Sequence, residues 1–324
     1  MKKNRLIAYY VPLSWLILFV LSSVLYYSAS ISTAETIKTN EWAAPNFYLL
    51  PDGKEGDLIR YGKELIANTS KYFGPKGTIA VISNGMNCQN CHLDAGTRLN
   101  ANCFAMVAST YPKFRNRSGR IESVEFRVNE CMERSMNGKK IDSLSKEMSA
   151  IVCYINWVGK DIPKGSKPSA GTDFKALPYL KKAADPEHGR SIFITKCARC
   201  HGVDGEGTAK IDSGGYIYPP LWGQHSYNVS AGMYRITKLA AFVKNNMPYK
   251  NTPAEPELTD EEAWDVAAFI LSKQRPVVFF NYDWPEIANK PVDYPFGPYA
   301  DSFSAQQHKY GPFEEIAKAN KKPL

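Results

Sequence analysis

One five-residue pattern, Cys-x-x-Cys-His, occurs twice in this chain, at 88–92 and at 197–201. The pattern is typical of covalent haem attachment, in which two thiols add to the haem vinyl groups and the histidine binds the iron. A single Cys-x-x-Cys also occurs in zinc and dithiol redox sites. Two copies, each followed by histidine in a chain with only 5 histidines, instead predict two covalently bound haem c groups and one-electron chemistry. The predicted attachment residues are Cys88, Cys91, His92, Cys197, Cys200 and His201.

Each haem iron needs a second axial ligand opposite its histidine. For the second haem, Met247 in the loop Asn-Asn-Met-Pro-Tyr is the leading candidate, because a thioether ligand raises the potential and suits electron transfer. Met233 is the alternative, but its surroundings have the pattern of a helix start, where core packing is the expected role. We interpret His188 and His225 as surface or structural histidines.

The first haem has no comparable Met-Pro sequence between its motif and the end of its domain. Methionines in this region more often fill a core than bind iron. Cys131 is the other option, and a thiolate ligand lowers the haem potential. Spacing alone does not choose between Cys131 and the methionines, which are Met106, Met132, Met136 and Met148.

The residues around the first motif predict two helices that position it. Apolar residues recur on one stripe of 58–72, which predicts a helix before the motif. A second helix follows, with Ser143 as its expected N-cap. Its apolar stripe consists of Leu144, Met148, Ile151, Ile155 and Val158. Prolines and glycines at 163–176 then mark a domain linker.

The second motif has the same setting. Asp185 is a plausible N-cap with Pro186 at the first helical position, and that helix leads into Cys197. Thr259 and Glu262 form a capping-box pattern for a last helix through 271. The repeated order predicts an all-α fold of two class I cytochrome c-like domains, at 35–165 and 166–275. The first begins with an extended lead-in over 35–57, and an irregular extension at 276–324 packs over both.

The N-terminus and the composition indicate where the protein works. Three basic residues precede an uncharged stretch, so 1–34 is either a cleaved signal peptide or a retained membrane anchor. Both alternatives predict export. We therefore expect a periplasmic protein, which a retained N-terminal segment would anchor to the inner membrane. The net charge of +8 includes no long basic run, so we expect no nucleic-acid partner.

A further segment, Arg-Val-Asn-Glu-Cys-Met-Glu-Arg-Ser-Met-Asn-Gly at 127–138, resembles the cysteine-ligand motif of the dihaem thiosulfate dehydrogenases, also described as tetrathionate reductases. The resemblance extends to both haem motifs, the Asn-Met-Pro loop and 291–301. It implies that the haem at His92, with Cys131 as its second ligand, is the active site, and that the second haem passes electrons outward. The N-terminal domain is also similar to the haem subunit of a multi-protein sulfur-oxidising system.

The same resemblance implies roles for individual residues. Arg117 and Arg127 match arginines that line the substrate site, and planar guanidinium groups suit oxyanions such as thiosulfate and tetrathionate. Ser135 matches a hydrogen-bond donor, and Cys131 is implied to leave the iron and bond to substrate sulfur. Some relatives carry a lysine before the methionine ligand; here that residue is Asn246, so we expect simple His201/Met247 ligation.

Two other functions are compatible with the motifs: a pure dihaem electron carrier, and a component that oxidises sulfur bound to a carrier protein. All three require a periplasmic or membrane-bound redox partner. Two cysteines remain without a haem role, Cys103 and Cys153. An exported protein can form disulfides, so we predict that they pair, with two buried free thiols as the alternative.

Overall fold

The computed structural model describes residues 42–173, 175–211, 214–249 and 254–322. The predicted signal peptide or anchor at 1–34 lies outside these residues, as does the first part of the lead-in at 35–57. Within the described ranges, no helix is long and apolar enough to cross a membrane. The export prediction therefore rests on the sequence.

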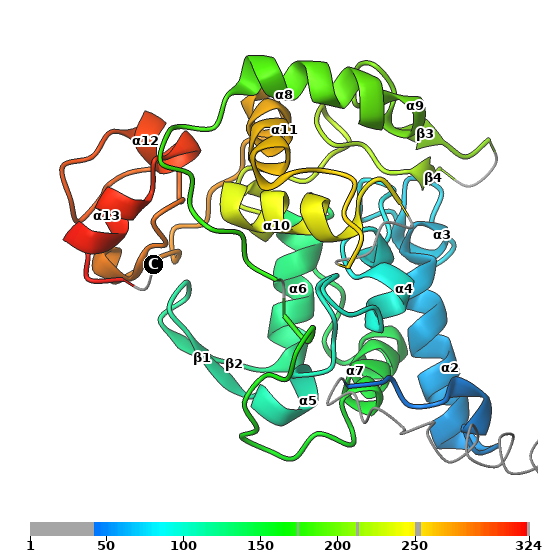
Figure 1. Ribbon diagram of the computed structural model, residues 1–324. Coiled ribbons are helices and arrows are strands. Elements are labelled where there is room, and N and C mark those ends of the chain that lie inside the picture. Colours follow the sequence, from blue (N-terminus) through cyan, green and yellow to red (C-terminus); the bar gives the residue numbers. More distant parts are fainter. Residues whose placement is uncertain (1–41, 174, 212–213, 250–253, 323–324) are drawn as a thin grey trace, which may run out of the picture. The chain divides into compact units, whose positions relative to one another are not determined.

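Two packed helices, α2 (Lys54–Ala67) and α7 (Lys146–Val158), frame the unit that carries the first haem motif (Figure 1). Their backbones meet at Gly62, where an added Cβ would lie only 2.0 Å from the carbonyl oxygen of Ala150. Glycine permits this approach because it has no side chain to hold the helices apart.

Shorter elements connect these two helices and carry the residues of interest. Strands β1 and β2 form an antiparallel hairpin, and α6 carries Cys131. Ser123 caps α6 by accepting a hydrogen bond from the backbone N–H of Phe126. The connecting elements are η1 (Phe47–Leu49), α3 (Thr69–Phe73), η2 (Cys88–Asn90), α4 (Leu93–Gly96), α5 (Val107–Thr110), β1 (Lys113–Arg115), β2 (Arg120–Glu122) and α6 (Val124–Arg134).

Two details of the predicted helices are wrong. The helix expected over 58–72 begins earlier, at Lys54, and breaks at Asn68 into α2 and α3. The cap of α7 is Ser145, not Ser143, because a turn in which Ser145 bonds back to Asp142 delays the helix. Leu144 therefore precedes the helix and is 93 % exposed, whereas the rest of its predicted stripe is buried.

The second motif is delivered by three consecutive helical segments: α8 (Pro186–Ile192), the π-helical turn η3 (Phe193–Cys197) and α9 (Ala198–His201). Asp185 caps α8, as predicted, by accepting hydrogen bonds from two backbone N–H groups. The predicted capping box opens α11 (Asp260–Ser272). Here too the helices meet at a glycine: a Cβ on Gly189 would lie 1.9 Å from the Asp265 carbonyl oxygen.

The remaining elements of the second unit are small. Met233 lies in the core, as expected, on the short helix η4. The secondary structure is helical apart from two small hairpins among the described residues, which agrees with the predicted all-α class. The elements are β3 (Thr208–Ala209), β4 (Tyr216–Tyr218), η4 (Gly232–Tyr234) and α10 (Ile236–Asn246).

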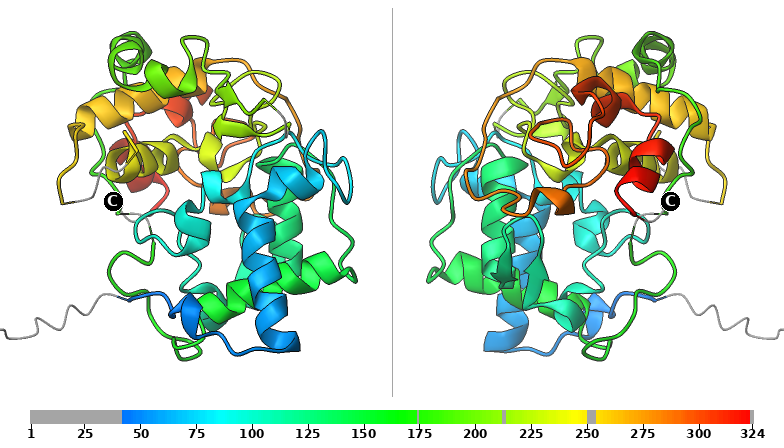
Figure 2. Two further views of the ribbon diagram at one scale, coloured as in Figure 1. Left: turned by 90° about the vertical axis from the view of Figure 1, so that its right-hand side faces the viewer. Right: turned by 90° about the vertical axis from the view of Figure 1, so that its left-hand side faces the viewer.

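The C-terminal segment from 276 is packed rather than loose (Figure 2). It contains η5 (Ile287–Asn289), α12 (Ala305–Tyr310) and α13 (Glu314–Ala319). Phe313 is buried against Trp264 of α11, with ring centroids 5.7 Å apart. Aromatic and aliphatic side chains of this segment thus complete the core of the second unit.

Candidate functional site

The loop after the first motif orients the ring of His92. Its Nδ1 donates a hydrogen bond to the Asn102 carbonyl oxygen at 2.6 Å, which leaves the lone pair on Nε2. Burial and, to a lesser extent, nearby Arg127 lower the pKa of His92 to about 4. The ring is therefore neutral, which is the form that binds metals.

His201 in the second motif is held in the same way. Its Nδ1 donates to the Pro219 carbonyl oxygen at 2.9 Å, and burial lowers its pKa. The ring of Tyr218 lies beside it, with ring centroids 6.3 Å apart. The two histidines, though unlike in their surroundings, therefore offer the same nitrogen to a metal.

The attachment thiols of the first motif are partly buried and lie near Cys131. Burial, together with the Cys131 sulfur, raises the pKa of Cys88 to about 11 and that of Cys91 to about 12. The fold thus brings α6 against the motif. Paired thiols, a neutral histidine with its lone pair on Nε2 and apolar surroundings fit a covalently bound haem.

The two attachment sites share part of their surroundings. Cys91 of the first motif and Cys197 of the second both pack against the buried apolar cluster of the second unit. Met247, directly after α10, packs against that cluster as well. The preceding Asn246 is pinned by its amide, which donates to the carbonyl oxygens of Asn100 and Phe242.

The alternative ligands lie in ordinary structural roles. Met132, Met136 and Met148 are at most 3 % exposed and fill the core of the first unit. His188 bonds to Asp265 at 2.7 Å, and His225 is exposed. This arrangement favours Cys131 and Met247, whose ligand roles remain predictions.

Arg127, Cys131 and Ser135 recur every four residues and so share one face of α6 and its C-cap. The Cys131 sulfur raises the pKa of Arg127, against the effect of burial, so the two side chains are close. Ser135 closes the helix by donating its backbone N–H to the Cys131 carbonyl oxygen at 2.8 Å. The face carries a thiol between a cation and a hydroxyl.

Arg117 reaches the same place from the β1–β2 turn. Burial, followed by repulsion from Arg127 and Arg134, lowers its pKa to about 10. Its Nη1 is buried and has no hydrogen-bond partner among the described residues. A buried donor without a partner is costly, and an anion would satisfy both the hydrogen bond and the charge.

The structure adds three residues that the sequence interpretation missed. Glu130 binds Arg127 at 2.9 Å through one carboxylate oxygen and Arg134 at 3.0 Å through the other. Arg134, which is 1 % exposed, also makes two 2.7 Å hydrogen bonds to Asp283 of the C-terminal segment. The Glu130–Arg134 spacing is a readable helix pair, but nothing in the sequence indicates Asp283. With Arg117, this group has one more cation than carboxylates.

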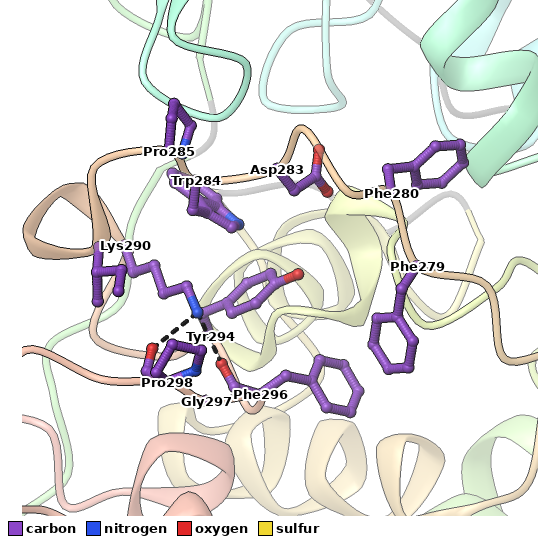
Figure 3. Close-up of a pocket in the computed structure, with 11 residues that line it drawn as sticks. Phe279, Phe280, Asp283, Trp284, Pro285, Lys290, Tyr294, Phe296, Gly297 and Pro298 are labelled. Atoms are coloured by element: carbon purple, nitrogen blue, oxygen red, sulfur yellow. Dashed lines mark hydrogen bonds between the residues drawn. The ribbon is translucent and has the colours of Figure 1, made fainter.

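A pocket of about 490 Å³ is lined by Asp283, a member of this charged group, and by Trp284 (Figure 3). The guanidinium of Arg117 lies 5.8 Å from the centre of the Trp284 ring. Aromatic rings line much of its wall. Lys290 also lines it, but its ammonium donates to the carbonyl oxygens of Phe296 and Pro298. We therefore interpret Lys290 as a residue that stabilises the loop containing Phe296 and Pro298 rather than as an anion-binding group.

The predicted disulfide between Cys103 and Cys153 is wrong, because both thiols are free. Cys103 lies next to Tyr154, whose pKa is raised by burial and further by that sulfur, whereas Cys153 faces Glu55 of α2. Successive residues on a helix point about 100° apart, so Tyr154 rather than Cys153 faces Cys103. The alternative of two free thiols is the one observed.

Two family models match the chain. Residues 80–163 match the model described as "SoxA/TsdA, cytochrome c domain", and residues 186–274 match the model described as "Cytochrome c". Each match includes one haem motif, and together they agree with two cytochrome c domains.

Curated proteins and a solved structure are similar over most of the chain. A thiosulfate dehydrogenase of Allochromatium vinosum is 36 % identical over 251 residues, which cover 76 % of this chain and 89 % of the relative. One from Psychrobacter arcticus is 35 % identical over 253 residues, covering 78 % and 71 %. The solved thiosulfate dehydrogenase (TsdBA) of Marichromatium purpuratum matches with TM-score 0.67 and 32 % identity over 74 % of this chain. Our chain spans 50 % of the length of that structure.

Proposed function

This chain belongs to the thiosulfate dehydrogenase family of dihaem c-type cytochromes, and from that premise we propose that it interconverts thiosulfate and tetrathionate. It is an oxidoreductase with two cytochrome c domains and two covalently bound c-type haems. In the proposed reaction a sulfur–sulfur bond joins two thiosulfates and releases two electrons, and tetrathionate reduction is the reverse.

The observation that carries the proposal is the cationic group beside Cys131. Two thiosulfates carry four negative charges, so bringing their sulfur atoms together requires nearby cations. Arg127 adjoins the Cys131 sulfur, and Arg117 offers a buried N–H without a partner among the described residues. We assign these arginines to binding and orienting the sulfonate oxygens, with the Ser135 hydroxyl as an additional donor.

The remaining roles concern the haems. We assign His92 and Cys131 as ligands of the first iron and His201 and Met247 as ligands of the second. The haems supply one-electron acceptors and donors for the two-electron reaction. Burial lowers the pKa of both histidines, which favours the neutral form that binds iron. EPR of the oxidised protein distinguishes thioether from nitrogen ligation at the second haem.

We place the activity in the periplasm, with electrons passing to or from a periplasmic or membrane-bound redox partner. This placement rests on the N-terminal sequence pattern at 1–34 and on the haem attachment motifs. Whether the N-terminal segment is cleaved or anchors the protein is decided by N-terminal sequencing of the mature protein.

Replacing Cys131 with glycine tests the function and its site together. We expect the Cys131→Gly variant to keep both haems, since the attachment thiols are untouched, but to lose turnover of thiosulfate with an artificial acceptor and of tetrathionate with a reduced donor. Cys131 and Cys153 both lie inside helices, so Cys153→Gly carries the same cost to helix stability and is the matched control, which should retain activity.

The outcomes separate the alternatives. Wild-type protein that turns over neither free substrate but exchanges electrons with a partner is a pure carrier. Activity only on carrier-bound sulfur identifies a sulfur-oxidising component. Full activity in Cys131→Gly would show that the site lies elsewhere.

A further inference from the structure

A second buried arginine, Arg275, lies away from the residues assigned to substrate. It lies three residues after the end of α11, is 7 % exposed, and donates through Nη2 to the Ile270 carbonyl oxygen at 2.7 Å. Its Nε and Nη1 have no hydrogen-bond partner among the described residues. None of the ion pairs between described residues includes Arg275.

The groups around Arg275 do not compensate its charge. Its guanidinium lies 4.4 Å from the ring centre of Tyr227 and 5.0 Å from that of Tyr234. The Tyr227 hydroxyl is buried beside the guanidinium, which lowers the pKa of this tyrosine against the larger effect of burial, and it has no hydrogen-bond partner of good geometry among the described residues. Half-buried Lys309 brings a second cation close, since its pKa is lowered by burial and also by Arg275. The buried guanidinium, with unpaired donors and another cation nearby, needs an anion, since an uncompensated buried charge is strongly destabilising.

The surroundings indicate which anion is available. Tyr227 and Tyr234 belong to the apolar cluster against which Cys91, Cys197 and Met247 pack. Both attachment sites therefore border the cluster that surrounds the guanidinium. A free anion has little access to a side chain that is 7 % exposed. A covalently attached haem, by contrast, brings its own carboxylates into the protein.

We propose that Arg275 and Tyr227 together bind a propionate carboxylate of one of the two haems. The guanidinium neutralises the carboxylate, and the tyrosine hydroxyl donates a hydrogen bond to it. Because the arginine follows the last helix of the second domain and Tyr227 lies near Cys91 of the first motif, this contact connects haem binding to the packing of the two domains.

The test uses the full dihaem protein with Arg275→Gln and Tyr227→Phe. Carboxylate carbons of the haems are labelled with ¹³C, and redox-difference infrared spectra report the propionate bands. We expect a labelled band to move in both variants, and more in Arg275→Gln. Potentiometric titration should show a lower midpoint potential for one haem in Arg275→Gln, because removing a positive charge favours oxidised iron.

Arg190→Gln, at an exposed arginine of α8, is the matched control and should change neither measurement. The haem whose potential falls is the source of the propionate. Labelled bands that stay in place overturn the proposal even if a potential moves, since Arg275 would then act only as a charge at a distance. If Arg275→Gln does not fold, the Tyr227→Phe variant still tests the proposal, because it keeps the packing of the ring and its labelled propionate bands can be measured in the same way.

Discussion

At the scale of single residues, the proposed chemistry depends on nitrogen atoms that the protein leaves available to a ligand. Nε2 of His92 and of His201 carries the lone pair because Nδ1 is engaged by a backbone carbonyl, and at His92 the Asn102 side-chain amide lies 3.4 Å from this nitrogen. Nη1 of Arg117 is buried without a partner among the described residues, beside two other guanidinium groups. Such unsatisfied groups are costly in a folded protein, so they mark places where a ligand completes the structure.

Arg117 provides a prediction at this scale. Loss of one charge-assisted hydrogen bond costs about 1.5–3 kcal/mol, so Arg117→Gln should raise KM for thiosulfate roughly 10- to 100-fold. Steady-state kinetics at several thiosulfate concentrations measures this. Arg120→Gln, at an exposed arginine of the same hairpin, should leave KM unchanged. An unchanged KM in Arg117→Gln would remove Arg117 from the substrate site.

At the scale of elements, both haem motifs depend on a pair of helices that cross at a glycine. Gly62 lets α2 approach α7, and Gly189 lets α8 approach α11. In each pair the first helix leads toward the motif and the second closes the unit. The glycines therefore set the distance between the segment that presents the thiols and the core behind it.

We expect Gly189→Ala to destabilise the second domain. The added methyl would meet the Asp265 backbone oxygen, which cannot move aside as a side chain could, so about 2–3 kcal/mol of stability should be lost. Thermal unfolding followed by circular dichroism measures the loss. Gly232→Ala is the control, since a Cβ there meets nothing within 4 Å. Equal melting temperatures for the two variants would contradict this account.

At the scale of the whole molecule, the C-terminal segment joins the parts that carry the proposed chemistry. Asp283 pairs with Arg134 of α6, and the backbone N–H of Trp284 donates to the Arg117 carbonyl oxygen at 2.6 Å. Further along, Asp293 binds Arg235 and the start of α10. One irregular segment thus holds both the arginines near Cys131 and the helix that leads to Met247.

Asp283→Asn should affect both stability and substrate binding. Breaking a buried ion pair from one side costs about 3–5 kcal/mol, and Arg134 would then compete with Arg127 for Glu130. We expect a lower unfolding midpoint in urea and a higher KM for thiosulfate. Glu286→Gln, at an exposed carboxylate of the same segment, should match the wild type in both measurements. A stability loss with an unchanged KM would limit Asp283 to a structural role.

Asp293 gives a pH-dependent prediction. Burial alone would raise its pKa, but Arg235 and Thr237 lower it below the ordinary value near 4. Its carboxylate therefore stabilises the fold above about pH 4, and this contribution is lost as the pH falls through the depressed folded-state pKa. Asp293→Ala should lose about 3 kcal/mol at neutral pH and show a weaker decline in acid. Urea unfolding at neutral pH and near pH 3 checks this, and parallel acid declines would contradict it.

Local signals in the sequence determined the chemistry of the haem sites and the repeated helical order. Cys-x-x-Cys-His is a contiguous pattern, and the caps at Asp185 and Thr259 depend on residues within one helical turn, so both are readable without a fold. The N-cap of α7 is not readable in this way. Ser143 and Ser145 lie within one turn of each other, and only the hydrogen bond from Ser145 to Asp142 shows that Ser145 is the cap.

Contacts between distant parts of the chain are decided by the tertiary structure. Cys131 lies near Cys88 and Cys91, Asp283 binds Arg134, and Cys103 faces Tyr154 instead of Cys153. These contacts join residues far apart in the chain and depend on how helices pack, since a rotation of about 100° changes which side chain faces a neighbour. The two Cys-x-x-Cys-His motifs are contiguous and therefore identify both haem sites without a fold, whereas only helix packing brings Arg117, Arg127 and Asp283 into one charged group beside Cys131.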